Sequence, residues 1–169
     1  RGIAGELRER IEELAKLETL DCGKPINESR GDLGFCADVC DYFAELAPRV
    51  LLEEPIALPD ADFASRLVPE PAGVAACVTP WNYPLMQAIA KVAPAIAAGC
   101  PTLLKPSPLA SLTCVEFGKI ATRHGLPPGA LAVITGGPPD GAADGARRLV
   151  EHPAACSHRR SCSGSRGAR

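Results

Sequence analysis

The middle of the sequence, residues 71–109, is the feature that most constrains how this chain can fold. Residues 73–78 are small and apolar and lie between two prolines, a pattern typical of a short strand buried on both faces. Residues 85–98 carry apolar side chains three or four positions apart, which predicts a helix that begins at Pro84. Residues 102–104 read as the next buried strand. The stretch is therefore expected to form a β-α-β unit with two parallel strands.

A polar side chain follows each of these two strands. Asn82 stands in the turn after the first strand, and Lys105 comes directly after the second. The carboxyl ends of neighbouring parallel strands meet at one edge of a sheet, and ligands bind at that edge in open α/β folds. We therefore expect Asn82 and Lys105 to lie near each other at a ligand-binding edge.

Two amphipathic helices are predicted ahead of this unit, over residues 3–20 and 28–47. The segment 21–25 separates them, and Pro48 is expected to end the second because proline interrupts the helix ladder. We interpret both helices as scaffold. Their apolar stripes consist of Leu7, Ile11, Leu14 and Leu17 in the first helix and Leu33, Val39, Tyr42, Phe43 and Leu46 in the second.

The segment 51–71 has a different character, because its prolines forbid a helix. We expect two exposed, extended stretches, the second over residues 63–68, joined by a polar turn near residues 59–62. This is a candidate hairpin whose free edge needs a partner strand.

Strand and helix patterns continue after the central unit. Residues 130–134 predict a third strand and residues 140–150 a weak helix rich in Ala and Gly. This order of elements predicts an α/β fold with a parallel sheet over residues 73–150, against which the two N-terminal helices pack. A further helix is predicted over residues 111–124, with the apolar side chains Leu112, Val115, Phe117 and Ile120.

Length and composition agree with one globular domain. The chain has 169 residues and a net charge of −2, which gives no sign of a nucleic-acid or membrane partner. Its eight cysteines are scattered, and Cys36 and Cys40 share a helix face. We interpret most of them as small buried hydrophobic residues rather than as zinc ligands or disulfides, which weakly favours a soluble protein of a reducing, intracellular compartment.

Several motifs resemble the aldehyde dehydrogenase superfamily. They are Pro-Trp-Asn-Tyr-Pro at residues 80–84, Ala-Gly-Cys at 98–100 and Leu-Lys-Pro-Ser at 104–107. Residues 17–25 resemble the plant-type betaine-aldehyde and aminoaldehyde branch. The resemblance, which extends from about residue 1 to about residue 152, implies an incomplete Rossmann-like sheet layer with an extended β arm. The domain organisation that follows is a partial NAD-binding domain over residues 1–155, with its arm at 51–71.

The resemblance also implies site residues. Asn82 would donate a hydrogen bond to the oxyanion that forms at the aldehyde carbon, and the alternative is a turn-forming asparagine. Lys105 would pair with the adenosine ribose of NAD or NADP, and the alternative is a surface lysine at a strand end. Asp21 and Leu109 match positions that hold a monovalent cation, although Asp21 is equally a helix-end residue. The same cofactor groove would be lined by Thr79, Pro80, Trp81, Pro106, Ser107 and Pro108.

One of these positions departs from the family pattern. Pro108 stands where members that prefer NAD commonly carry glutamate, whose carboxylate accepts from the ribose hydroxyls. Because proline cannot do this, the sequence leaves the preference between NAD and NADP open.

Residues 156–169 do not continue the family pattern. They consist mainly of Ser, Gly and Arg, which fits a disordered end, a basic anion-binding tail or the product of a frame slip. The nucleophilic cysteine, the general base and the pyrophosphate turn of the family are expected beyond the matching region. We therefore expect a fragment of an aldehyde-oxidising enzyme that is inactive as it stands and homo-oligomeric when complete. The alternative is a non-catalytic module that binds a nucleotide or associates with intact subunits.

Overall fold

The computed structural model describes residues 1–59 and 64–137. Its helices and strands follow one another in the order α1 (Gly2–Glu9), α2 (Ile11–Cys22), α3 (Ile26–Val50), β1 (Glu54–Ile56), β2 (Ser65–Leu67), β3 (Ala75–Val78), α4 (Pro84–Ala97), β4 (Thr102–Lys105), α5 (Leu112–Arg123) and β5 (Leu131–Val133).

The predicted parallel sheet is confirmed. Strand β4 lies between β3 and β5, and both pairings are parallel. The register places Val78 opposite Lys105 at the carboxyl ends of β3 and β4. The predicted signals for α4 are also confirmed, because Pro84 is its first residue and Gly99 follows it with a φ of 77°.

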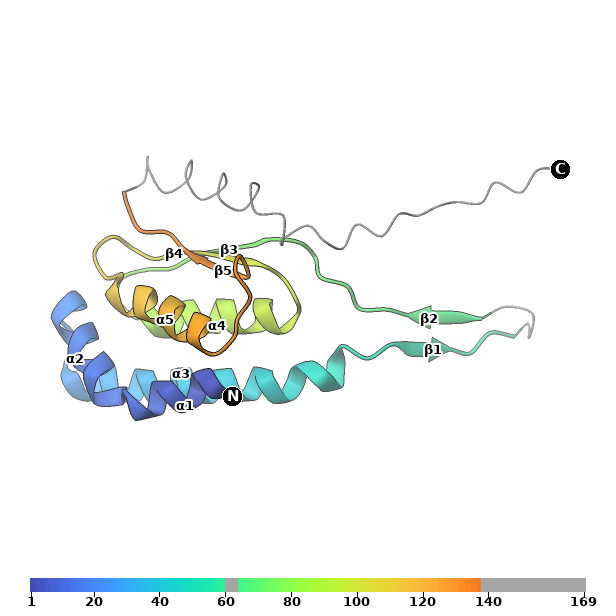
Figure 1. The fold of residues 1–169 in the computed structure, drawn as a ribbon, viewed down its shortest axis with the longest axis horizontal. Coiled ribbons are helices and arrows are strands. Elements are labelled where there is room, and N and C mark those ends of the chain that lie inside the picture. The colour runs from blue at the N-terminus through green and yellow to red at the C-terminus, as the bar shows by residue number, and fades with distance from the viewer. Residues whose placement is uncertain (60–63, 138–169) are drawn as a thin grey trace.

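The helices form two layers on one side of the sheet (Figure 1). Helices α4 and α5 lie next to the strands, and α1, α2 and α3 lie beyond them. The N-terminal helices were expected to pack against the sheet layer. They contact α4 and α5, which lie between them and the strands. One continuous core joins the layers, and its fully buried large side chains include Leu7, Leu14, Leu33, Leu85, Ile89, Leu104 and Ile120.

The prediction that the first strand is buried on both faces is wrong for the described residues. Cys77 faces the helices and is buried, whereas Ala76 and Val78 point the other way and are exposed. Both described crossover helices lie on one side of the sheet, so small apolar residues on the opposite face are left uncovered there.

The single helix predicted over residues 3–20 is in fact two. The chain leaves helical geometry at Arg10, with φ −100° and ψ 17°, and α1 meets α2 at an angle (Figure 1). The Arg10 guanidinium hydrogen-bonds Glu6, Glu13 and, across the helix layers, Glu116. This bridge accompanies the break, which has no glycine or proline to mark it in the sequence.

The prediction that Pro48 ends the second helix is wrong. Pro48 lies inside the last turn of α3. A proline removes one N–H donor, and the ladder resumes after it, since the Leu51 N–H donates to the Ala47 carbonyl at 3.1 Å. Two residues assigned to apolar stripes are also exposed. These are Tyr42 on α3 and Leu112 at the start of α5.

The predicted hairpin is confirmed. Strands β1 and β2 pair antiparallel and project away from the helical body (Figure 1). The turn predicted near residues 59–62 lies outside the described residues except for Pro59, and the helix predicted over 140–150 and the segment 156–169 lie entirely outside them. Among the residues that the structure describes, no helix is long and apolar enough to cross a membrane.

Candidate functional site

The carboxyl ends of β3 and β4 bring the two motif loops together. The Thr79 N–H donates to the Lys105 carbonyl at 3.2 Å, one step beyond the last ladder pair. The loop of residues 80–83 therefore begins beside the loop of residues 106–109. This juxtaposition was predicted from the β-α-β pattern.

Two prolines shape the first loop. Pro80 and Pro84 bracket Trp81, Asn82 and Tyr83, and Tyr83 is the N-cap residue of α4. The Tyr83 carbonyl accepts from the Gln87 N–H at 3.0 Å, so the turn passes directly into the helix. All three bracketed residues are exposed, which leaves the Asn82 amide accessible to a bound molecule.

The second loop is held by local hydrogen bonds. Lys105 Nζ donates to the Pro106 carbonyl at 3.2 Å, and Ser107 Oγ accepts from the Leu109 N–H at 3.2 Å. Pro106 is buried and Pro108 is exposed. The lysine stays at the sheet edge, with its ammonium near the loop backbone.

One buried polar atom at this edge has no partner. Thr79 is 4% exposed, and its hydroxyl has no hydrogen-bond partner within the described part of the chain. Buried hydroxyls are nearly always paired in folded proteins. The edge therefore presents an unused donor and acceptor beside both loops, which fits a polar ligand.

Asp21, one of the two predicted cation ligands, contacts the chain three residues after the other one, Leu109. Asp21 Oδ2 accepts from the Leu112 N–H at 2.8 Å, so this carboxylate caps the N-terminus of α5. Leu109 is three residues earlier and largely exposed. Residues 1–59 and 64–137 contain no group of three or more His, Cys, Asp or Glu side chains placed to hold a metal. Cation binding at Asp21 and Leu109 stays a prediction.

A buried ion cluster behind the first loop was not predicted. Lys24 Nζ hydrogen-bonds Glu18 at 2.8 Å and Asp32 at 2.5 Å, and Glu18 is fully buried. The Lys24 ammonium also lies 4.9 Å from the centre of the Tyr83 ring. Glu18 accepts a second bond from Thr113 Oγ1 at 3.1 Å.

The sequence did contain a signal for this cluster. Glu18 falls at helical spacing with Leu7, Ile11 and Leu14, on the apolar stripe of the N-terminal helices. A carboxylate on such a stripe must be paired when it is buried. Its partner Lys24 lies in the segment 21–25, which separates the two predicted helices and belongs to the family-like motif of residues 17–25.

Four of the described cysteines are poor candidates for a nucleophile. Burial raises the pKa of Cys40 to about 11 and that of Cys114 to about 12, and it raises the pKa of Cys36 and Cys77 as well. A catalytic thiol needs the opposite shift, because the thiolate is the attacking species. These cysteines pack as predicted.

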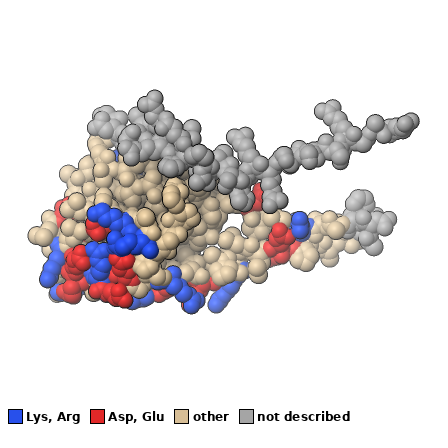
Figure 2. Space-filling model, in the orientation of Figure 1, with Lys and Arg blue, Asp and Glu red and all other residues tan. Residues whose placement is uncertain are grey.

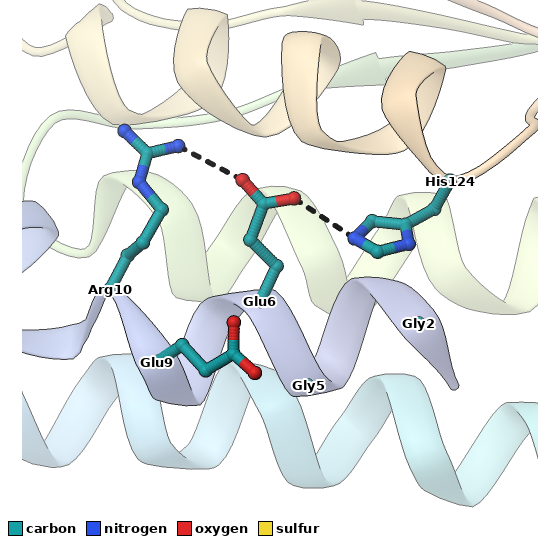
Figure 3. Close-up of a pocket in the computed structure, with 6 residues that line it drawn as sticks. All are labelled: Gly2, Gly5, Glu6, Glu9, Arg10 and His124. Atoms are coloured by element: carbon teal, nitrogen blue, oxygen red, sulfur yellow. Dashed lines mark hydrogen bonds and ion pairs between the residues drawn. The ribbon is translucent and has the colours of Figure 1, made fainter.

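A shallow pocket of about 450 Å³ lies between α1 and the end of α5 (Figure 3). It is lined by Gly2, Gly5, Glu6, Glu9, Arg10 and His124. Glu6 points between Arg10 and His124, whereas Glu9 points away from them. Basic and acidic side chains are mixed at this end of the molecule in Figure 2. Within the pocket, Glu6 is paired with Arg10 and His124.

Glu6 is the hub of this surface network. Hydrogen bonds from Arg123, Arg10 and His124 hold the pKa of its carboxyl at about 2, below its ordinary value of 4.5. A carboxyl whose pKa is depressed by folding stabilises the fold fully above its unfolded pKa, and the contribution is lost as pH falls through the folded value. The contribution of Glu6 should therefore disappear between about pH 4.5 and pH 2.

The Glu6→Gln variant tests this window. We expect a lower urea midpoint than that of the parent at pH 7, and a difference that shrinks as the pH falls below 4.5. Glu9→Gln is the matched control, since Glu9 lines the same pocket without joining the network. A Glu6→Gln deficit that stays constant down to pH 3 would contradict the assignment.

Comparison with known proteins agrees with this fold. Residues 1–156 match the sequence model of the aldehyde dehydrogenase family. The chain therefore belongs to this family. It is 47% identical over 155 residues to the peroxisomal aminoaldehyde dehydrogenase 2 of Pisum sativum. It is 50% identical over 138 residues to betaine aldehyde dehydrogenase 1 of Oryza sativa subsp. japonica.

Solved structures share the fold. The betaine aldehyde dehydrogenase of Staphylococcus aureus in complex with NAD⁺ superimposes with a TM-score of 0.77 at 43% identity, over 81% of this chain and 27% of that one. The match to the pea protein covers 90% of this chain and 30% of the pea protein. The match to the rice protein covers 80% of this chain and 27% of the rice protein. The chain thus spans about a third of the length of these relatives. The predicted family and α/β fold are confirmed.

Proposed function

We propose that this chain forms the adenosine side of the cofactor domain of an NAD(P)-dependent aldehyde dehydrogenase. The observation that carries the proposal is the pairing of Thr79 with Lys105, which sets the Trp-Asn loop beside the Lys-Pro-Ser loop at one sheet edge. The NAD⁺ complex of the similar Staphylococcus aureus enzyme supports NAD as the cofactor.

Each side chain at the edge has a role that its chemistry allows. Lys105 and Ser107 would bind the adenosine ribose, and the unpartnered Thr79 hydroxyl would complete its bonds there. The bound cofactor supplies the acceptor for a hydride. The exposed Asn82 amide would donate to the oxygen of the aldehyde as negative charge develops on it. Pro80, Trp81, Pro106 and Pro108 would line the groove.

The substrate class follows from the relatives. Proteins named as aminoaldehyde and betaine aldehyde dehydrogenases are 45–52% identical to this chain. We infer that the complete protein oxidises an aldehyde of this type to the acid. The 169-residue polypeptide is expected to show no turnover by itself, because the nucleophile, the general base and the pyrophosphate turn of the family are expected outside the matching region.

The domain organisation belongs to the same proposal. Residues 1–155 would be the cofactor-domain portion, and residues 51–71 an arm that associates with other subunits of a homo-oligomer. Exposed apolar side chains on the strands of the arm, or next to them, support this association. They are Ile56, Leu58, Leu67 and Val68. Association through this arm alone, without catalysis, is the second candidate function.

Calorimetric titration of the 169-residue chain with NAD⁺ tests the cofactor assignment. We expect weak binding, with a Kd on the order of a millimolar, because the described edge reaches only the adenosine half of the cofactor. Lys105→Met should weaken it further. Lys91→Met removes an exposed lysine from α4 and should leave the affinity unchanged. Equal affinities in all three proteins would remove Lys105 from the site.

A further inference from the structure

We propose that Lys24, fixed by Glu18 and Asp32, is a positioning residue that holds the Trp81–Tyr83 turn in place through the face of the Tyr83 ring. The inference rests on the proposed function, because that turn carries the Asn82 donor. It concerns residues on α2, on α3 and in the connection between them, which are distant in sequence from the turn.

Burial and charge make Lys24 a rigid support. The residue is only 9% exposed, and its ammonium is bonded on two sides by carboxylates from α2 and α3. Burial alone would lower the pKa of Lys24, but the bonds to Asp32 and Glu18 outweigh it and raise the pKa. Lys24 therefore remains protonated, and its ammonium is held in one position.

The Tyr83 ring transmits this position to the turn. A cation within about 6 Å of an aromatic centre is attracted to the ring face, and Lys24 Nζ lies 4.9 Å from that of Tyr83. Tyr83 is bonded directly to Asn82 on one side and to Pro84, the first residue of α4, on the other. Because Pro84 restricts the backbone of the residue before it, a fixed Tyr83 ring limits the conformations open to the turn that carries Asn82.

The same end of α2 also reaches the second loop. Glu18 accepts from Thr113 Oγ1, and Asp21 accepts from the Leu112 N–H, both in the first turn of α5. Helix α5 begins just after the loop of residues 106–109. Carboxylates of α2 therefore hold the elements that carry both ligand loops, with the first loop reached through Lys24.

A second ion pair provides a matched control. Arg30 of α3 hydrogen-bonds Glu12 of α2 at 2.8 and 2.9 Å, on the exposed surface. This pair ties together the same two helices as the buried cluster. Within the described residues, the side-chain hydrogen bonds of Arg30 reach Glu12 of α2 and Asn27 of α3, so the loss of this pair should not move the turn.

The single tryptophan of the chain, Trp81, lies in the turn and reports on it directly. The experiment is fluorine NMR of the full chain labelled with fluorotryptophan, which gives one resonance per conformation. We expect Lys24→Met to shift this resonance and broaden it by about twofold or more, as the turn begins to exchange between conformations. Arg30→Met and the conservative Tyr83→Phe should both retain the parental line.

A double-variant comparison separates positioning from general loosening. Tyr83→Leu should reproduce the Lys24→Met spectrum, and adding Lys24→Met to Tyr83→Leu should change it no further. If Lys24→Met unfolds the chain, the Lys24→Met/Glu18→Gln variant, which leaves no unpaired charge at position 18, takes its place with the same expectation. A parental line from the folded Lys24 variant, or additive effects of the two substitutions, would overturn the proposal. No cofactor or aldehyde is present, so a failed NAD⁺ titration leaves this result intact.

Discussion

Replacing Lys24 by methionine is expected to lower the free energy of unfolding by about 3–5 kcal/mol. The substitution leaves the Glu18 carboxylate fully buried, with Thr113 Oγ1 as its remaining side-chain donor. A buried ion that loses its partner keeps its desolvation cost and loses the attraction that offset it. Methionine fills a similar volume, so lost packing contributes little.

Urea unfolding at pH 7 measures this effect, with two controls. Arg30→Met breaks an exposed ion pair between the same helices and should cost about 1 kcal/mol or less. Lys24→Met/Glu18→Gln removes the charge of Lys24 and that of the fully buried Glu18, leaves the less buried Asp32, and should recover a large part of the loss. If Lys24→Met costs no more than Arg30→Met, the cluster contributes no more than a surface pair.

Truncating Leu104 to alanine is expected to cost about 2–5 kcal/mol. Leu104 is fully buried on the central strand β4, opposite Cys77 on one side and Val133 on the other. The loss combines the transfer energy of the deleted methyl groups with the cavity they leave among packed strands and helices.

Leu20→Ala is the control for this truncation. Leu20 is 85% exposed on α2, so the same chemical change should alter stability by about 0.5 kcal/mol or less. Thermal and urea unfolding of both variants provide the comparison. Equal losses in the two proteins would mean that β4 is not the centre of the core.

Local signals explain why the centre of the fold could be predicted. The β3–α4–β4 unit has its own markers, namely a proline at the first position of α4, a glycine after its end and apolar runs of strand length on either side. Each marker acts within a few residues. The geometry of the β3–α4–β4 unit therefore does not depend on distant partners. The edge that carries Asn82 and Lys105 could be predicted from this unit.

The features that were missed depend on residues far apart in the sequence. Arg10, where the first predicted helix breaks, bonds Glu116, which is 106 positions away. The burial of Glu18 depends on Lys24 and on Thr113, 95 positions along the chain. Periodicity places Glu18 on an apolar stripe, but it does not identify the distant residues that pair with it. Similarly, an apolar strand pattern does not say that Val78 is left exposed on a face that the described helices do not cover.

The central claim is that the ends of β3 and β4 form one cofactor edge. Backbone amide shifts of the labelled 169-residue chain, followed during an NAD⁺ titration, test it most directly. The account predicts shifts concentrated in residues 79–83 and 105–109, which saturate together and weaken in Lys105→Met. Shifts concentrated at the pocket of Gly2, Glu6 and His124, or no shifts at millimolar NAD⁺, would contradict it.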